Sequence, residues 1–109
     1  MSTDNMQIAK TILEQLGGRK FTFMCGVKHA AAIERGLSFR IPGTMTRNRI
    51  NYVKITLEPS DTYKVDFGVI RGHTYKIVST HDDIYCDDLA ELFRSETGLE
   101  TRMPAVRFA

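Results

Sequence analysis

The stretch NYVKITLEPSDTYKVDFGVIRGHTYKIVS, residues 51–79, decides the fold of this chain. It contains three runs of alternating apolar and polar side chains, at residues 51–58, 61–68 and 73–79. Such alternation in segments rich in β-branched and aromatic residues is typical of strands with one buried face. Turn-forming residues separate the runs, around Pro59 and at Arg71-Gly72. The stretch therefore predicts an antiparallel meander.

The alternation also assigns side chains to the two faces of the predicted sheet, because successive side chains of a strand point to opposite sides. The apolar parity, which we expect to face the core, consists of Val53, Ile55, Leu57, Tyr63, Val65, Phe67, Tyr75 and Ile77. The opposite parity is mostly polar, and we expect it to face solvent.

The segment before the meander begins with a predicted helix at residues 5–16. Ile8, Ile12 and Leu16 recur every four positions and form one apolar stripe. Gly17-Gly18 should end this helix, because glycine readily adopts the left-handed conformation of a helix terminus. Its start has three candidate capping residues, Thr3, Asp4 and Asn5.

Two more strands are predicted between this helix and the meander, at residues 20–25 and 37–41, where alternation returns. The first would bury Phe21, Phe23 and Cys25, and the second Leu37, Phe39 and Ile41. Residues 26–36 fit either a short helical turn or an extension of the first strand into a hairpin. Residues 43–50 read as a polar loop.

A second helix is predicted at residues 84–97, where Leu89, Leu92 and Phe93 have helical spacing and Gly98 follows. The tail at residues 100–109 should be loosely docked or frayed. The whole chain, residues 1–109, is thus expected to form a single α+β domain with its core in residues 5–99. We predict a two-layer sandwich: an antiparallel sheet of about five strands packed against an N-terminal and a C-terminal helix.

Composition limits the function classes. With 42% hydrophobic and 26% charged residues the chain has ordinary globular composition. No apolar run approaches the roughly 20 residues that span a bilayer, and the N-terminus lacks signal-peptide character. We therefore expect a cytoplasmic protein that does not contact membranes.

Charge is divided unevenly along the chain. Residues 19–76 contain 11 Lys or Arg and four Asp or Glu, whereas residues 77–109 contain three and seven. Six of these cationic side chains fall on the solvent-facing parity of the strands or on the adjoining loop, together with one aromatic ring. This candidate nucleic-acid or partner-binding set comprises Arg40, Arg47, Arg49, Tyr52, Lys54, Lys64 and Lys76. Such a face suits phosphates and bases, although the same residues also suit an ordinary solvated sheet.

The second helix supplies an alternative, protein-directed surface. Its acidic residues Asp87, Asp88 and Glu91 fit either a solvated helix face or a patch that docks on a basic protein.

Catalytic and metal-binding motifs are not found in the sequence. No nucleophile elbow, P-loop or paired CxxC occurs. In a reducing compartment Cys25 and Cys86 read as free thiols, with a disulfide between them or a redox role as the alternative. We therefore expect a non-enzymatic protein without metal or cofactor.

The chain resembles a group of small phage- and prophage-encoded proteins of unknown function. The resemblance is carried by residues 8–18 (IAKTILEQLGG), Phe23-Met24 with Gly26 and Lys28, residues 37–42 (LSFRIP), 50–57 (INYVKITL), 61–68 (DTYKVDFG) and 84–99 (IYCDDLAELFRSETGL). It implies a non-enzymatic accessory protein of the bacterial host cytoplasm, and the basic sheet face predicts that this protein binds a host nucleoprotein or nucleic acid. Stoichiometric inhibition of a host defence nuclease, as by anti-CRISPR proteins, and a homo-oligomeric role in virion assembly are the alternatives.

Overall fold

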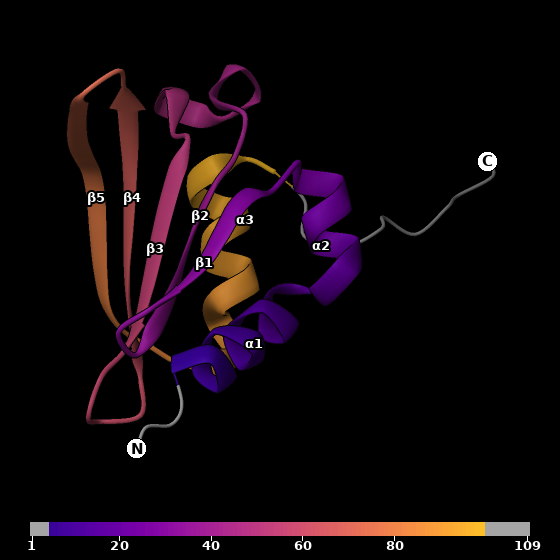
Figure 1. Ribbon diagram of the computed structural model, residues 1–109, viewed down its shortest axis with the longest axis vertical. Helices are drawn as coiled ribbons and strands as arrows, with labels where there is room; N and C mark the ends of the chain where they lie inside the picture. Colours follow the sequence, from indigo (N-terminus) through magenta and orange to yellow (C-terminus); the bar gives the residue numbers. More distant parts are fainter. Residues whose placement is uncertain (1–4, 100–109) are drawn as a thin grey trace, which may run out of the picture.

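The structure, a computed structural model, describes residues 5–99 of the chain (Figure 1). Three helices and five strands follow one another as α1 (Asn5–Leu16), α2 (Gly18–Cys25), β1 (Lys28–Ile33), β2 (Gly36–Arg40), β3 (Tyr52–Leu57), β4 (Tyr63–Arg71), β5 (Thr74–Ile84) and α3 (Leu89–Thr97). Short 3-10 turns η1 (Gly43–Met45) and η2 (Arg47–Arg49) precede β3, and η3 (Cys86–Asp88) precedes α3.

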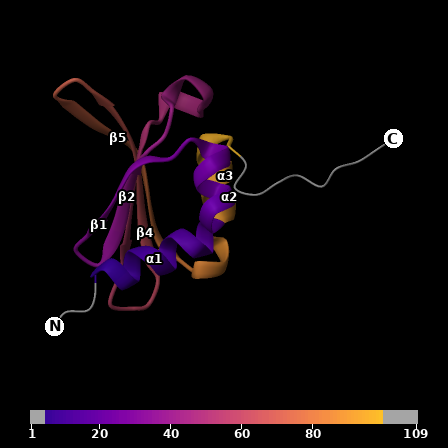
Figure 2. The same cartoon turned by 45° about the vertical axis from the view of Figure 1, so that its right-hand side comes forward.

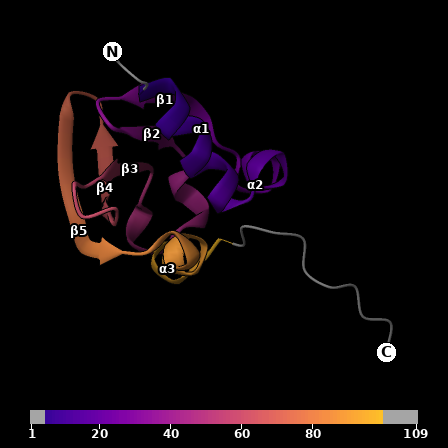
Figure 3. The same cartoon turned by 90° about the horizontal axis from the view of Figure 1, so that it is seen from below.

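The five strands form one antiparallel sheet in sequence order, from β1 to β5. Figure 3 shows the helices on one side of this sheet. The face toward the helices buries Phe39, Val53, Ile55, Val65 and Phe67. The predicted α+β architecture, with a meander and helices at both ends, is therefore confirmed.

A cluster of three phenyl rings joins the sheet to the helices. The ring of Phe21 in α2 meets the rings of Phe39 in β2 and Phe93 in α3 edge to face, with centroids 5.6 and 5.1 Å apart. The Phe39 and Phe93 centroids are 6.1 Å apart. Edge-to-face pairs at this separation are favourable beyond the area they bury, so the cluster fixes α2 and α3 on the sheet.

The predicted strand at residues 20–25 is wrong, because these residues form α2. Phe21 and Cys25, four residues apart, are buried on one side of the helix, whereas Phe23 is 87% exposed. Gly18, at φ 63°, starts α2 directly after α1, and Gly26 ends it in the left-handed conformation. A six-residue run with apolar residues at every second position fits both a strand and one side of a short helix. The burial of Phe21 and Cys25, four residues apart, shows that the segment is a helix.

The first strand of the sheet is instead β1. The segment that the sequence left open between helix and hairpin therefore forms a strand, which pairs with β2. Asn5 does not cap α1: it is the first residue of that helix, and its side-chain carbonyl accepts the Arg35 N–H at 2.8 Å. This bond ties the start of α1 to the β1–β2 turn.

The second helix is shorter than predicted. It begins at Leu89, because β5 continues to Ile84 and leads into η3. Asp87 and Asp88 lie in η3, and the Asp88 side chain makes no capping hydrogen bond to α3. The candidate caps Thr3 and Asp4 and the tail at residues 100–109 lie outside the described residues. Within those residues, no helix is long and apolar enough to cross a membrane.

The assignment of Tyr75 and Ile77 to the core is also wrong. Phe67 pairs with Ser79, but Gly68 pairs with Ile77, so Val78 is an extra residue in β5. Such a β-bulge reverses which residues of the strand face which side beyond it. Tyr75 and Ile77 are consequently 45% and 48% exposed.

The phenyl cluster and the helical assignment of α2 can be tested together. Phe21→Ala should lower the free energy of unfolding by about 3 to 5 kcal/mol, because it removes a fully buried ring. Phe23→Ala, in the same helix, should change it by at most about 0.5 kcal/mol. Urea denaturation measures both values. Equal losses at the two positions would contradict the helix, since a strand would bury both rings.

Candidate nucleic-acid interface

The face of the sheet opposite the helices brings together four of the seven predicted residues. Arg40 pairs with Tyr52 across β2 and β3, Lys54 lies two positions further along β3, and Lys64 pairs with Thr56. We call this surface of the sheet, on which Arg40, Tyr52, Lys54 and Lys64 lie, the outer face. Lys54 is exposed, whereas Arg40, Tyr52 and Lys64 are half-buried.

Lys28 joins the outer face as a cation that the sequence analysis did not single out. It lies directly opposite Arg40 across β1 and β2. Like charges in such a cross-strand pair repel and destabilise the sheet. Two adjacent cations on the same face therefore favour an anion held between or above them.

The bulge in β5 adds a second aromatic ring to the outer face. The rings of Tyr52 and Tyr75 meet edge to face, with centroids 5.3 Å apart. Gly68 leaves the space for this contact, since a Cβ there would lie 2.7 Å from the Tyr75 ring. The adjacent apolar pair Ile77-Val78 was the sequence signal for the bulge, because it interrupts the alternation.

Asp66 is an acidic residue on this face and lies opposite Lys54. Its carboxylate accepts a hydrogen bond from the Thr80 hydroxyl at 2.9 Å. Burial, together with the charges of Asp66 and Tyr52, raises the pKa of the Tyr75 phenol above its ordinary value. The phenol is therefore neutral at pH 7 and does not repel a phosphate.

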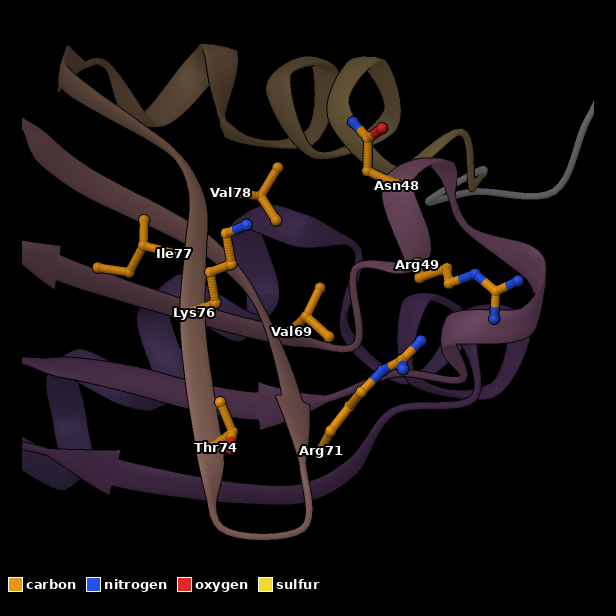
Figure 4. A pocket seen from close by; sticks show the side chains of 8 residues that line it. All are labelled: Asn48, Arg49, Val69, Arg71, Thr74, Lys76, Ile77 and Val78. Atoms are coloured by element: carbon orange, nitrogen blue, oxygen red, sulfur yellow. The ribbon is translucent and has the colours of Figure 1, made fainter.

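The bulge also removes Lys76 from the outer face. Lys76 pairs with Val69 and lies on the other side of the β4–β5 hairpin. There it lines a cavity of about 690 Å³ between the hairpin and η2, which we call the groove (Figure 4). Its lining residues are Asn48, Arg49, Val69, Arg71, Thr74, Lys76, Ile77 and Val78. Two predicted residues, Arg49 and Lys76, thus meet in a different place from the rest.

Asn51 positions the hairpin beside η2. Its side-chain amide donates to the Ile70 carbonyl at 2.9 Å, and its side-chain carbonyl accepts the Ile70 N–H at 2.7 Å. These two bonds hold β4 in place beyond its last pair with β3, Tyr52 and Gly68. Figure 2 shows the end of the β4–β5 hairpin bending away from the side of the sheet on which the helices lie.

Arg47 is placed for a structural contact. Its guanidinium donates to the Ser95 carbonyl in the last turn of α3 at 3.1 Å. A cation at this position satisfies a carbonyl that has no partner within the helix and favours the helix dipole. Arg47 therefore connects η2 to α3, away from the outer face.

The alternative acidic surface is interrupted by an ion pair. Asp87 and Asp88 are exposed in η3, but the Glu91 carboxylate pairs with the Arg94 guanidinium one turn further along α3. Cys25 is buried and Cys86 exposed, and neither forms a disulfide. Among residues 5–99, no three His, Cys, Asp or Glu side chains gather where they would hold a metal ion.

Comparisons with known proteins give no relative from which a function could be transferred. No family model, no curated protein and no solved structure matches this chain.

The role of Asn51 predicts a measurable loss. Asn51→Ala should lower the free energy of unfolding by about 1 to 3 kcal/mol, because two part-buried hydrogen bonds disappear. It should also speed amide hydrogen exchange at Ile70. Thr44→Ala, at an exposed position of the same loop, is the control. Unchanged exchange at Ile70 would show that Asn51 does not hold the hairpin.

Proposed function

We propose that this chain is a small non-enzymatic accessory protein that binds nucleic acid, free or in a host nucleoprotein, through the outer face. One observation carries the proposal: the cross-strand cations Lys28 and Arg40 continue directly into the Tyr52–Tyr75 ring pair. Cations that follow a backbone beside rings that stack on bases are the combination used by single-strand binders.

The energetics favour a ligand over simple solvation. An ordinary solvated sheet gains nothing from placing Lys28 opposite Arg40, since the pair costs stability. Nor does it need half-exposed tyrosine rings beside that pair. A phosphate between the cations removes the repulsion, and a base covers the exposed ring surface. Single strands fit better than duplex, because only unpaired bases offer their faces for stacking.

Protein-directed inhibition of a host nuclease through Asp87, Asp88 and Glu91 is the weaker proposal. Glu91 already has Arg94 as an intramolecular partner. For a phage-type protein in a bacterial cell, the nucleic acid of a host nucleoprotein is therefore a better-supported target than a basic protein surface.

Charge reversal on the outer face tests the proposal. Arg40→Glu with Lys64→Glu should weaken binding to a labelled oligothymidylate by at least roughly tenfold, because two phosphate contacts become repulsive. Lys54 is left intact, because a glutamate there would face Asp66. Stability should not fall, since Arg40→Glu gives Lys28 an opposite charge as its neighbour. Fluorescence anisotropy and urea denaturation provide the two measurements.

The matched control is Lys10→Glu with Lys20→Glu, which changes net charge equally at exposed positions of α1 and α2. It should retain most of the affinity. If both double variants bind as the unmodified chain does, the outer face is not the binding surface. If both lose affinity equally, binding depends on net charge alone and the proposal fails.

The aromatic pair yields a separate expectation. Tyr75→Ala should cost about 1 to 3 kcal/mol of binding free energy, the range for one base stacked on an aromatic ring. Tyr75→Phe should bind normally, because the ring rather than the hydroxyl makes the contact. Tyr85→Ala removes a tyrosine that is 63% exposed and lies after β5, away from the hairpin end. Equal affinity of the Tyr75→Ala and Tyr85→Ala variants would contradict stacking on Tyr75.

A further inference from the structure

The groove on the other side of the β4–β5 hairpin contains cations that have no anionic partner within residues 5–99. Arg49, Arg71 and Lys76 line it, and none of its lining residues within the described chain is acidic. The ion pairs found among residues 5–99 involve none of these three cations. Figure 4 shows the Arg71 side chain extending from the end of β4 toward the turn that carries Arg49.

The other lining residues are the apolar Val69, Ile77 and Val78 and the polar Asn48 and Thr74. Val69 and Val78 point into the space between the hairpin and η2, with Lys76 beside them (Figure 4). A second cavity of about 480 Å³ shares Arg49, Val69 and Arg71 and extends along the loop past Thr44 and Thr46. A cavity of about 690 Å³ lies within the range of small-ligand sites. Guanidinium groups beside an apolar surface match a phosphate attached to a flat base.

The backbone of η2 is held in a costly conformation at the groove. Asn48 and Arg49 have φ values of 54° and 58°, in the left-handed region that side chains other than glycine rarely adopt. Glycine would relieve this cost at position 49, yet the chain places an arginine there. The strained turn therefore presents a cation to the groove at the expense of local stability.

We infer that the groove binds one nucleotide of a single strand, holding its phosphate with Arg49, Arg71 and Lys76 and its base against Val69 and Val78. The inference rests on the proposed function and extends it. β5 is the edge of the sheet that residues 5–99 form, so no further strand of this part of the chain separates the groove from the outer face. Tyr75 and Lys76, adjacent in sequence, face opposite sides of that edge. A single-stranded nucleic acid that passes over the β4–β5 hairpin therefore contacts both surfaces.

The test compares Arg49→Ala with Arg71→Ala, as a double variant, against Arg19→Ala with Lys20→Ala, which removes two exposed cations from α2. Affinity for an oligothymidylate is measured by anisotropy at several salt concentrations. The groove variant should bind at least roughly tenfold more weakly, and its log–log salt slope should be shallower by about 0.7, for the one single-strand phosphate that the groove holds. A groove variant that matches the α2 variant in affinity and slope overturns the inference.

Titration with thymidine 5′-monophosphate at millimolar concentration tests nucleotide binding in the groove independently of strand binding to the outer face. Amide and methyl resonances of Val69 and Val78 should shift, and the groove variant should abolish the shifts. Absence of shifts, or identical shifts with inorganic phosphate, overturns the inference.

The two proposals fail separately in these experiments. If the outer-face variant loses strand affinity while the groove variant does not, the groove inference fails and the proposed function stands. If the mononucleotide shifts the groove resonances but no oligonucleotide binds, the outer-face function fails, and so does the inference that the groove holds a nucleotide of a strand.

Discussion

Contact among the rings of Phe21, Phe39 and Phe93 is the interaction on which the rest of the structure depends. These rings come from α2, β2 and α3 and lie fully inside the core. Residues 71–78, at the end of the β4–β5 hairpin, are all exposed. The fold therefore combines a closed core with an arm held by Asn51, and both candidate binding surfaces involve that arm.

One extra residue, Val78, gives the arm its two chemical faces. Without the bulge, Tyr75 would point toward the helix side of the sheet and Lys76 toward the outer face. With it, Tyr75 meets Tyr52 above Gly68, and Lys76 joins Arg49 and Arg71 in the groove. The outer face thus gains an aromatic ring in exchange for a cation. The arrangement explains how a chain of modest net charge presents two separate cationic surfaces.

Much of the fold was predictable from the sequence, because regular alternation over β3 and β4 specifies one buried face. The prediction for residues 20–25 was wrong because Phe21, Phe23 and Cys25 have the spacing of a strand. Only Phe21 and Cys25 are buried, which is the pattern of a helix. Side-chain parity located Arg40, Tyr52, Lys54 and Lys64 on one face. It could not locate Tyr75 or Lys76, since a bulge is set by pairing with β4. Lys28 and Arg71 were missed because their importance depends on cross-strand neighbours and on the packing of η2.

Chemical-shift mapping of the unmodified protein with a short oligothymidylate tests the central claim most directly. We expect amide resonances to change along two connected surfaces: Arg40, Tyr52 and Tyr75 on the outer face, and the residues around Arg49 and Arg71 in the groove. The exposed side of α1 should be unaffected. Spectra that do not change at low salt, or changes confined to the helices, would show that neither surface binds a single strand.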